Sequence, residues 1–385
     1  MSRSCSSAHS DIVKIALFTD SAVFAGTERH MLDLALGLRG EGVDVRLACP
    51  VPSALAERAA HDGLPVVKIQ KRGLLDSAAI RIVAGMLKTG AIDLVHAHNG
   101  RTALLAAVAV KLAGRGCAVA TQHFLEPAHV SRSGVKALLS RAAHRWMNRR
   151  TRRFIAISEA ARTAMLARAQ APTEKISVVP NGMALPDPAT LPRPETIRAE
   201  LGIEPAAKLL VCVARLEREK SLETLISAMK AVTAADPSVV CVIAGEGSQR
   251  QALTAQIAGN KLEGNVRLIG FRPDASALMN AADLFVLPSA VESFGLVLLE
   301  AMSVGKAVIA IRAGGPVEIV MHGETGVFVA PGGADEMARA ILSLIRDAEL
   351  RRRMGEAGHA RFLEKFTVER MTRATMSAYQ KALDP

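Results

Sequence analysis

The sequence is poor in aromatic residues and in cysteine. Of its 385 residues, 3% are Phe, Trp or Tyr, so Ala, Val, Leu and Ile must fill the interior. The five cysteines are odd in number and scattered, without the spacing of a metal site, and we expect no bound metal. A disulfide scaffold is thereby excluded, and a reducing cytoplasm is the compartment that suits such a chain best.

Long apolar runs are absent as well. No run reaches the roughly 18–20 residues that a membrane-spanning helix needs. The N-terminus, MSRSCSSAHSD, is polar and lacks the apolar middle of a secretory signal, so we interpret it as a disordered lead-in.

Positive charge is abundant and one-sided. The chain has a net charge of +11, and residues 1–190 hold 25 Lys and Arg against 14 Asp and Glu. From residue 191 onward the two kinds are equal, at 23 each. The excess charge is therefore a property of the first half alone.

The first half alternates β-branched apolar runs with amphipathic helical patterns. Residues 28–42 (ERHMLDLALGLRGEG) carry apolar residues at helical spacing and end on glycine, a normal helix stop. Alternating strands and helices predict a parallel sheet with helices on both faces. The expected strands are 13–20, 44–50, 66–70, 93–98, 118–123, 153–158 and 176–181.

Residues 180–195 hold five prolines, which is typical of a linker. The alternation then restarts, and a chain of this length is expected to form two domains. We predict an α/β fold of two Rossmann-like, doubly wound parallel-sheet domains, 11–185 and 186–366, facing across a cleft, with helix 367–383 packing back on the first. The expected strands of the second half are 208–215, 238–245, 265–270, 284–289, 307–311 and 326–330.

Charged residues and glycines follow the strands of the second half. Arg215 and Lys220 follow its first strand, and residues 245–248 (GEGS) follow the next. Residues 291–295 (VESFG) and 312–318 (RAGGPVE) each lead from a strand into a helix. Free N–H groups at helix N-termini, an arginine and a lysine together indicate a diphosphate site.

In their order and spacing, these segments resemble the family-4 retaining glycosyltransferases of the GT-B architecture, the glycosyl transferases group 1, over about residues 11–380. The last matching segment is the most specific, because two glutamates separated by seven residues flank Ser-Phe-Gly and precede a Gly-Gly-Pro turn. The matches are 178–182 (VVPNG), 213–228 (VARLEREKSLETLISA), 242–250 (VIAGEGSQR), 268–271 (LIGF) and 289–320 (SAVESFGLVLLEAMSVGKAVIAIRAGGPVEIV).

The resemblance implies a role for each matching residue. Arg215 and Lys220 neutralise the diphosphate of a nucleotide-sugar donor. Glu300 binds the ribose, and Glu292 holds hydroxyls of the sugar. His123 is the active-site histidine, with a place in the core as the alternative. The other implied donor contacts are Gly26, Gly245, Glu246 (equally consistent with a solvated turn), Phe271, Arg272, Phe294, Gly295 and Leu296, and His96 and His98 are candidates for the acceptor side.

The resemblance also implies the reaction. A sugar passes from a nucleoside diphosphate to a hydroxyl acceptor with retention of configuration, and the leaving phosphate takes the acceptor proton. The sequence has no Asp-x-Asp motif to hold a metal, so the cations and a helix dipole are expected to neutralise the leaving group without any cofactor. The alternatives are a nucleotide-sugar 2-epimerase of the same fold and a non-catalytic nucleotide-sugar-binding subunit.

Residues 130–153 hold eight Lys or Arg and no acid, and Trp146 lies on the apolar side of the helix that their pattern predicts. Basic amphipathic helices are typical of proteins that bind anionic membrane surfaces. The alternative is an ordinary packed helix with solvated arginines. No motif indicates nucleic acid. We therefore expect a peripheral protein on the inner face of the cytoplasmic membrane that glycosylates a lipid-linked or envelope glycan, such as a lipopolysaccharide or glycolipid.

Overall fold

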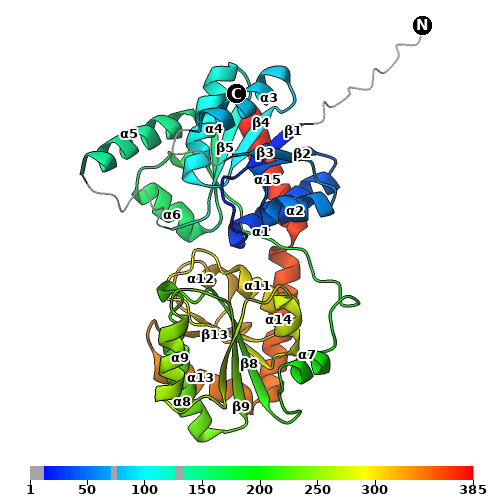
Figure 1. Cartoon of the computed structure of the whole chain (residues 1–385), viewed down its shortest axis with the longest axis vertical. Helices are drawn as coiled ribbons and strands as arrows, with labels where there is room; N and C mark the ends of the chain where they lie inside the picture. The colour runs from blue at the N-terminus through cyan, green and yellow to red at the C-terminus, as the bar shows by residue number, and fades with distance from the viewer. Residues whose placement is uncertain (1–12, 71–75, 126–133, 385) are drawn as a thin grey trace. The chain divides into compact units, whose positions relative to one another are not determined.

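The computed structural model describes residues 13–70, 76–125 and 134–384, without the side chains of 134–141. The chain divides into two compact units, each built on a parallel sheet flanked by helices (Figure 1). The predicted fold class is thereby confirmed. The N-terminal unit comprises Met1–Ile157, Ala161–Val179 and Met371–Pro385, and the C-terminal unit comprises Ser158–Ala160 and Pro180–Arg370.

The described strands of the N-terminal unit form one parallel sheet in the order β3-β2-β1-β4-β5-β6-β7. Its central strands are buried on both faces, which explains why they are continuous apolar runs rather than alternating ones. The strands are β1 (Lys14–Phe18), β2 (Asp44–Pro50), β3 (Val66–Ile69), β4 (Leu94–Ala97), β5 (Cys117–Gln122), β6 (Arg153–Ala156) and β7 (Ile176–Val178).

Two helices of this unit begin at side-chain caps and end at left-handed glycines. Asp76 accepts hydrogen bonds from the first turn of α3 and Asn99 from that of α4, while Gly90 and Gly114 end them with φ of 74° and 69°. The helices are α1 (Gly26–Gly40), α2 (Ala54–His61), α3 (Ser77–Thr89), α4 (Gly100–Ala113), α5 (Gly134–Arg150), α6 (Glu159–Ala167) and, from Met371 onward, α15 (Val368–Leu383).

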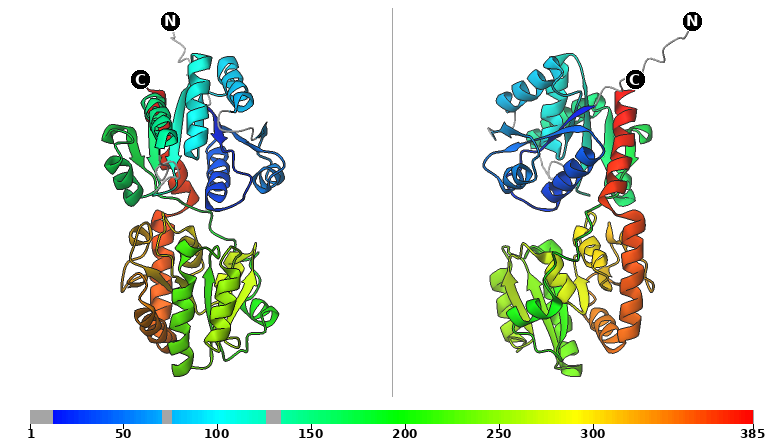
Figure 2. Two further views of the ribbon diagram at one scale, coloured as in Figure 1. Left: turned by 60° about the vertical axis from the view of Figure 1, so that its left-hand side comes forward. Right: turned by 90° about the vertical axis from the view of Figure 1, so that its right-hand side faces the viewer.

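The C-terminal helix α15 packs on the N-terminal sheet. Figure 2 shows it in red against this unit, and the Tyr379 hydroxyl lies 2.7 Å from Nδ1 of His96 at β4. Tyr379 is 3% exposed, so the end of the chain completes the core of the unit that begins it.

The sheet of the C-terminal unit has the order β10-β9-β8-β11-β12-β13, all pairs parallel. Its core is aliphatic and includes two buried free cysteines, Cys212 and Cys241. Burial raises the pKa of the Cys212 thiol to about 12, so this thiol stays protonated. The strands are β8 (Lys208–Val213), β9 (Val239–Ala244), β10 (Val266–Gly270), β11 (Leu284–Leu287), β12 (Val308–Ile311) and β13 (Gly326–Val329).

Helices cover the C-terminal sheet as well. Among the described helices of the chain, none is both long and apolar enough to cross a membrane. The helices of this unit are α7 (Pro194–Glu200), α8 (Leu222–Ala235), α9 (Arg250–Gly259), α10 (Ala275–Ala281), α11 (Leu296–Ser303), α12 (Pro316–Ile319), α13 (Ala334–Arg346) and α14 (Ala348–Lys365).

Candidate active site

The order of the C-terminal strands reverses between β8 and β11. The chain runs outward from β8 to β9 and β10, then returns to β11 on the other side of β8 and continues to β12 and β13. In open parallel sheets, ligands bind at this switch point, beyond the carboxyl ends of the two strands. A ligand site is therefore expected in the loops after β8 and β11, which contain Lys220 and Glu292.

Lys220 and Glu292 form an ion pair across the switch point. The Nζ of Lys220 lies 2.6 Å from Oε2 of Glu292, and each side chain is 15% exposed. The backbone N–H of Val291 also donates to the carbonyl of Glu219, at 3.4 Å, which ties the same two loops together. The sequence pairs Glu292 with Glu300 as two parts of one motif, but the contact partner of Glu292 is a lysine from another loop.

Arg215 lies in the same loop as Lys220 but is more open to solvent. Its Nη2 is 2.7 Å from Oε1 of Glu219, and the two side chains are 65% and 41% exposed. An exposed pair of this kind contributes little to stability, so Arg215 can exchange Glu219 for an anionic ligand at small cost.

The helix that follows β11 starts without a side-chain cap. Gly295, with φ of 103°, precedes Leu296, and within the described residues no side chain accepts a hydrogen bond from the first turn of α11. Phe294, which precedes Gly295, is buried and 3% exposed. Glu300 is half-buried in the second turn of the helix. The N-terminus of α11 thus presents N–H donors at the edge of the sheet where Lys220 lies.

The glycines of the neighbouring loops are required by backbone packing. A Cβ on Gly245, which has φ of 146°, would lie 1.9 Å from the carbonyl oxygen of Ala214. A Cβ on Gly315 would lie 2.3 Å from Cα of Phe294. The resemblance implies that Gly245 contacts the donor, and in the structure its lack of a side chain also leaves room for the loop that carries Arg215.

Three of the implied donor contacts, Glu246, Phe271 and Arg272, lie after β9 and β10. Glu246 forms an exposed ion pair of 3.2 Å with Arg250. Phe271 is 68% exposed, which leaves its ring accessible for stacking. Arg272 is held by ion pairs to Glu200 and to Asp274, so its guanidinium braces the loop.

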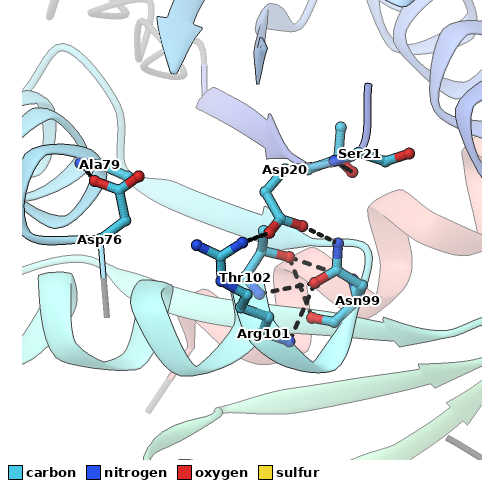
Figure 3. A network of polar contacts seen from close by, with 8 residues as sticks. Asp20, Ser21, Asp76, Ala79, Asn99, Arg101 and Thr102 are labelled. Atoms are coloured by element: carbon cyan, nitrogen blue, oxygen red, sulfur yellow. Dashed lines mark hydrogen bonds and ion pairs between the residues drawn. The ribbon is translucent and has the colours of Figure 1, made fainter. Parts of the chain in front are cut away.

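The N-terminal sheet has a switch point of the same kind, between β1 and β4. Asp20 lies beyond β1, where its carboxylate accepts a hydrogen bond of 2.9 Å from Nδ2 of Asn99 and pairs with Arg101 (Figure 3). Asn99 in turn caps α4 by accepting from the N–H of Thr102, at 2.9 Å. The sequence analysis missed this cluster, although Asp20 ends one predicted strand and Asn99 directly follows another.

Four histidines gather beside this cluster of the same unit. His96 contacts the Thr121 hydroxyl at 2.6 Å and Tyr379 at 2.7 Å, which makes it a core residue. His98 and His123 share a hydrogen bond of 3.1 Å. His30, which the sequence analysis missed because it lies inside a predicted helix, packs edge-to-face against His123 with ring centroids 4.8 Å apart.

Burial keeps the imidazoles of His96, His98 and His123 neutral. Desolvation, followed by the neighbouring histidines, lowers the pKa of His98 well below its usual range, and the same causes lower the pKa of His123. His123 is 7% exposed, so a core position and a contact with a small substrate are both consistent with its burial. Gly26 is the first residue of α1 in this unit.

The basic segment forms α5 and one wall of a positively charged cavity. Residues 130–133 and the side chains of 134–141 lie outside the described residues. A cavity of about 710 Å³ is lined by eight cationic side chains and one acid. Arg150 and Lys111 both lie over the ring of Trp146, at 4.8 and 5.9 Å from its centroid. The charged lining residues are Lys111, Arg115, Arg149, Arg150, Arg152, Arg153, Lys175, Lys381 and Asp384.

Comparison with known proteins agrees with this geometry. Residues 194–361 match the family described as Glycosyl transferases group 1, and residues 24–185 match Glycosyltransferase Family 4. Glycogen synthase of Mycobacterium tuberculosis is 32% identical over 298 residues, covering 75% of this chain and 69% of its own. The chain belongs to the family-4, group 1 glycosyltransferases and has the GT-B fold.

Two further proteins are similar over different extents. The N-acetyl-alpha-D-glucosaminyl L-malate synthase of Bacillus anthracis is 31% identical over 188 residues, so the match spans about half of either chain (49%). HepE of Anabaena, solved in complex with UDP and glucose, is 26% identical with a TM-score of 0.83, covering 96% of this chain and 99% of its own.

Proposed function

We propose that the protein transfers a sugar from a nucleoside diphosphate sugar to a hydroxyl acceptor with retention of anomeric configuration. The observation that carries this proposal is the pairing of Lys220 with Glu292 beside the uncapped N-terminus of α11, at the switch point of the C-terminal sheet. A cation, N–H donors and a carboxylate placed together suit a ligand that has both phosphate and hydroxyl groups. The UDP and glucose bound in HepE support a ligand of this class.

Each donor contact has a proposed part in binding. Lys220 and Arg215 bind the diphosphate together with the N–H groups of Phe294, Gly295 and Leu296. Glu292 accepts from sugar hydroxyls, and Glu300 accepts from the ribose. Phe271 stacks on the base because its ring is 68% exposed. Gly245, Glu246 and Arg272 shape the surrounding loops, while His123 and Gly26 are the candidates of the N-terminal unit.

The proposed chemistry needs charge neutralisation more than a nucleophile. The bond from the anomeric carbon to the diphosphate oxygen breaks, and a bond from the same carbon to the acceptor oxygen forms on the same face. The acceptor proton passes to the leaving phosphate. Lys220, Arg215 and the α11 N-terminus stabilise the negative charge that develops on the diphosphate, and we propose that this step requires no metal.

The donor is tested by a thermal-shift panel of UDP, GDP, ADP and their glucose conjugates. We expect one nucleotide series to raise the melting temperature of the wild type, and Lys220→Ala to abolish the shift. The matched control is Arg218→Ala, which removes an exposed cation from the same loop. No shift with any nucleotide contradicts the proposal. Epimerised donor formed without an acceptor would point to a 2-epimerase instead.

We also propose that the acceptor is lipid-linked and that the protein docks on an anionic membrane surface at the inner face of the cytoplasmic membrane. The support is the charged cavity, in which eight cations face one acid, together with the position of Trp146 beneath two of those cations. Within the described residues, no carboxylate pairs with Arg149, Arg150 or Arg152.

Vesicle flotation tests this docking. At low salt, the wild type should float with phosphatidylglycerol vesicles and not with phosphatidylcholine vesicles. Replacing Arg149, Arg150 and Arg152 together by Ala should remove flotation. A control that replaces Arg339, Arg353 and Arg370, exposed cations of the C-terminal unit, loses the same charge and should still float. Equal recovery with both lipids counts against membrane docking.

A further inference from the structure

Three buried histidines of the N-terminal unit converge from different elements. His30 lies in α1, His98 follows β4 and His123 follows β5, and they are 3%, 0% and 7% exposed. One ring nitrogen of each lies within 4.8 Å of the other two. The sequence gives no sign of such a set, because the three positions share no short spacing and come together only through the order of the sheet.

The surroundings of these rings are consistent with a ligand. Nε2 of His98 is buried and has no hydrogen-bond partner among the described residues, a costly state for a polar atom unless a ligand approaches it. His96 supports the group without joining it. Both of its nitrogens are engaged, by Tyr379 and Thr121, and its ring lies 4.1 Å from that of His98.

We propose that His30, His98 and His123 bind one divalent transition-metal ion, for which Zn²⁺ is the best match. Zinc takes imidazole nitrogens at about 2.0–2.1 Å, which places the nitrogens of a tetrahedral site about 3.3 Å apart. The observed spread of 4.8 Å closes to that value by side-chain movements of about 1 Å. A set made only of imidazoles disfavours Mg²⁺ and Ca²⁺, which prefer oxygen.

Three protein ligands leave one tetrahedral position open. Sites that are purely structural fill all four positions from the protein, whereas an open position admits water or a substrate oxygen. The ion would also occupy His123, the histidine that the family resemblance places in the active site near the sugar. If that function holds, metal and sugar compete for His123; the metal site itself does not depend on it.

The test is direct metal binding by the full-length protein, prepared without a polyhistidine tag and stripped by a chelator. We expect isothermal titration with ZnCl₂ to give one site per chain, and CoCl₂ to give the visible absorption of a four-coordinate ion. Each of His30→Gln, His98→Gln and His123→Gln should weaken binding at least about 10- to 100-fold. The control is His61→Gln, whose side chain is 88% exposed and which should bind as the wild type does.

Two further measurements keep the outcome decisive. If a variant fails to fold by circular dichroism, X-ray absorption of the zinc-loaded wild type should still report three imidazole ligands. UDP affinity should be unchanged by chelation, which separates this site from the proposed donor site. Absence of stoichiometric binding by the wild type overturns the proposal, as does equal affinity in the three ligand variants and His61→Gln.

Discussion

Lys220 and Glu292 are charged residues that the fold holds mostly out of water. A buried pair contributes modestly when intact, because desolvation offsets its attraction, but losing one partner leaves an unpaired charge. The two positions lie 72 residues apart in the sequence, so their contact depends on strand order. The position of this charge pair at the switch point of the sheet favours a functional role over a purely stabilising one.

A double-mutant cycle measures this coupling. Lys220→Ala should lower the free energy of unfolding by about 3 kcal/mol, because it leaves the Glu292 carboxylate unpaired at 15% exposure. Adding Glu292→Gln to that variant should recover about 1–2 kcal/mol. Urea denaturation of the four proteins gives the values. Strict additivity would mean that the two side chains do not interact in solution.

Gly245 packs directly against the backbone of the loop that carries Arg215. Gly245→Ala should destabilise the protein by about 2–4 kcal/mol, because the new Cβ would meet the Ala214 carbonyl at 1.9 Å and φ is 146°. Gly264→Ala is the matched control, since nothing lies within 4 Å of its Cβ position, and its effect should stay within about 0.5 kcal/mol. Similar melting temperatures for both variants would contradict the packing described for this loop.

At the scale of elements, strand positions and fold class are predictable from the sequence, but contacts between loops are not. Every predicted strand overlaps an observed one, because buried parallel strands are continuous apolar runs. Residues that follow strand ends, such as Arg215 and Glu292, can likewise be identified from the sequence as candidate site residues. The role of His30 is not predictable, because a histidine inside a helix fits the amphipathic pattern of that helix. The ion pair between Lys220 and Glu292 is not predictable either, because a contact between two loops leaves no local pattern in the sequence.

The side chain of Asp76 caps the N-terminus of helix α3. Asp76 is 2% exposed and accepts hydrogen bonds from the N–H groups of Ala78 and Ala79, at 3.1 and 3.0 Å. Asp76→Ala should cost about 1–2 kcal/mol of stability, whereas Asp76→Asn keeps an acceptor and should cost less. Thermal unfolding of the two variants compares them. Indistinguishable losses would show that the side chain does not cap this helix.

At the scale of the whole molecule, the described thiols are all internal. Burial raises the pKa of Cys49 and of Cys117 to about 11, above the usual thiol value near 9. A raised pKa favours the neutral thiol in the folded state, so stability should fall as the pH rises from about 9 toward 11.

Thiol labelling tests this burial. Cys5 lies outside the described residues, so we use a Cys5→Ser variant. It should show no reaction with Ellman's reagent at pH 8 while folded and four thiols after unfolding. Rapid labelling of the native variant would be incompatible with the buried positions described.

The positive charge is distributed unequally between the two units, and we propose that the C-terminal unit binds the donor while the N-terminal unit attracts the acceptor. The excess positive charge of the sequence lies in residues 1–190, where the charged cavity is found, and the proposed donor contacts lie mainly in the C-terminal unit. This division agrees with a donor held by local loops and an acceptor attracted by a long-range field.

Donor turnover by Lys220→Ala and Glu300→Ala, with Arg218→Ala as control, tests the central claim most directly. With the nucleotide sugar that the binding panel selects, we expect the first two variants to lose at least about 10²–10³-fold in kcat/KM while keeping the wild-type fold by circular dichroism. The control should match the wild type. Wild-type rates in either Lys220→Ala or Glu300→Ala would contradict the placement of the donor site.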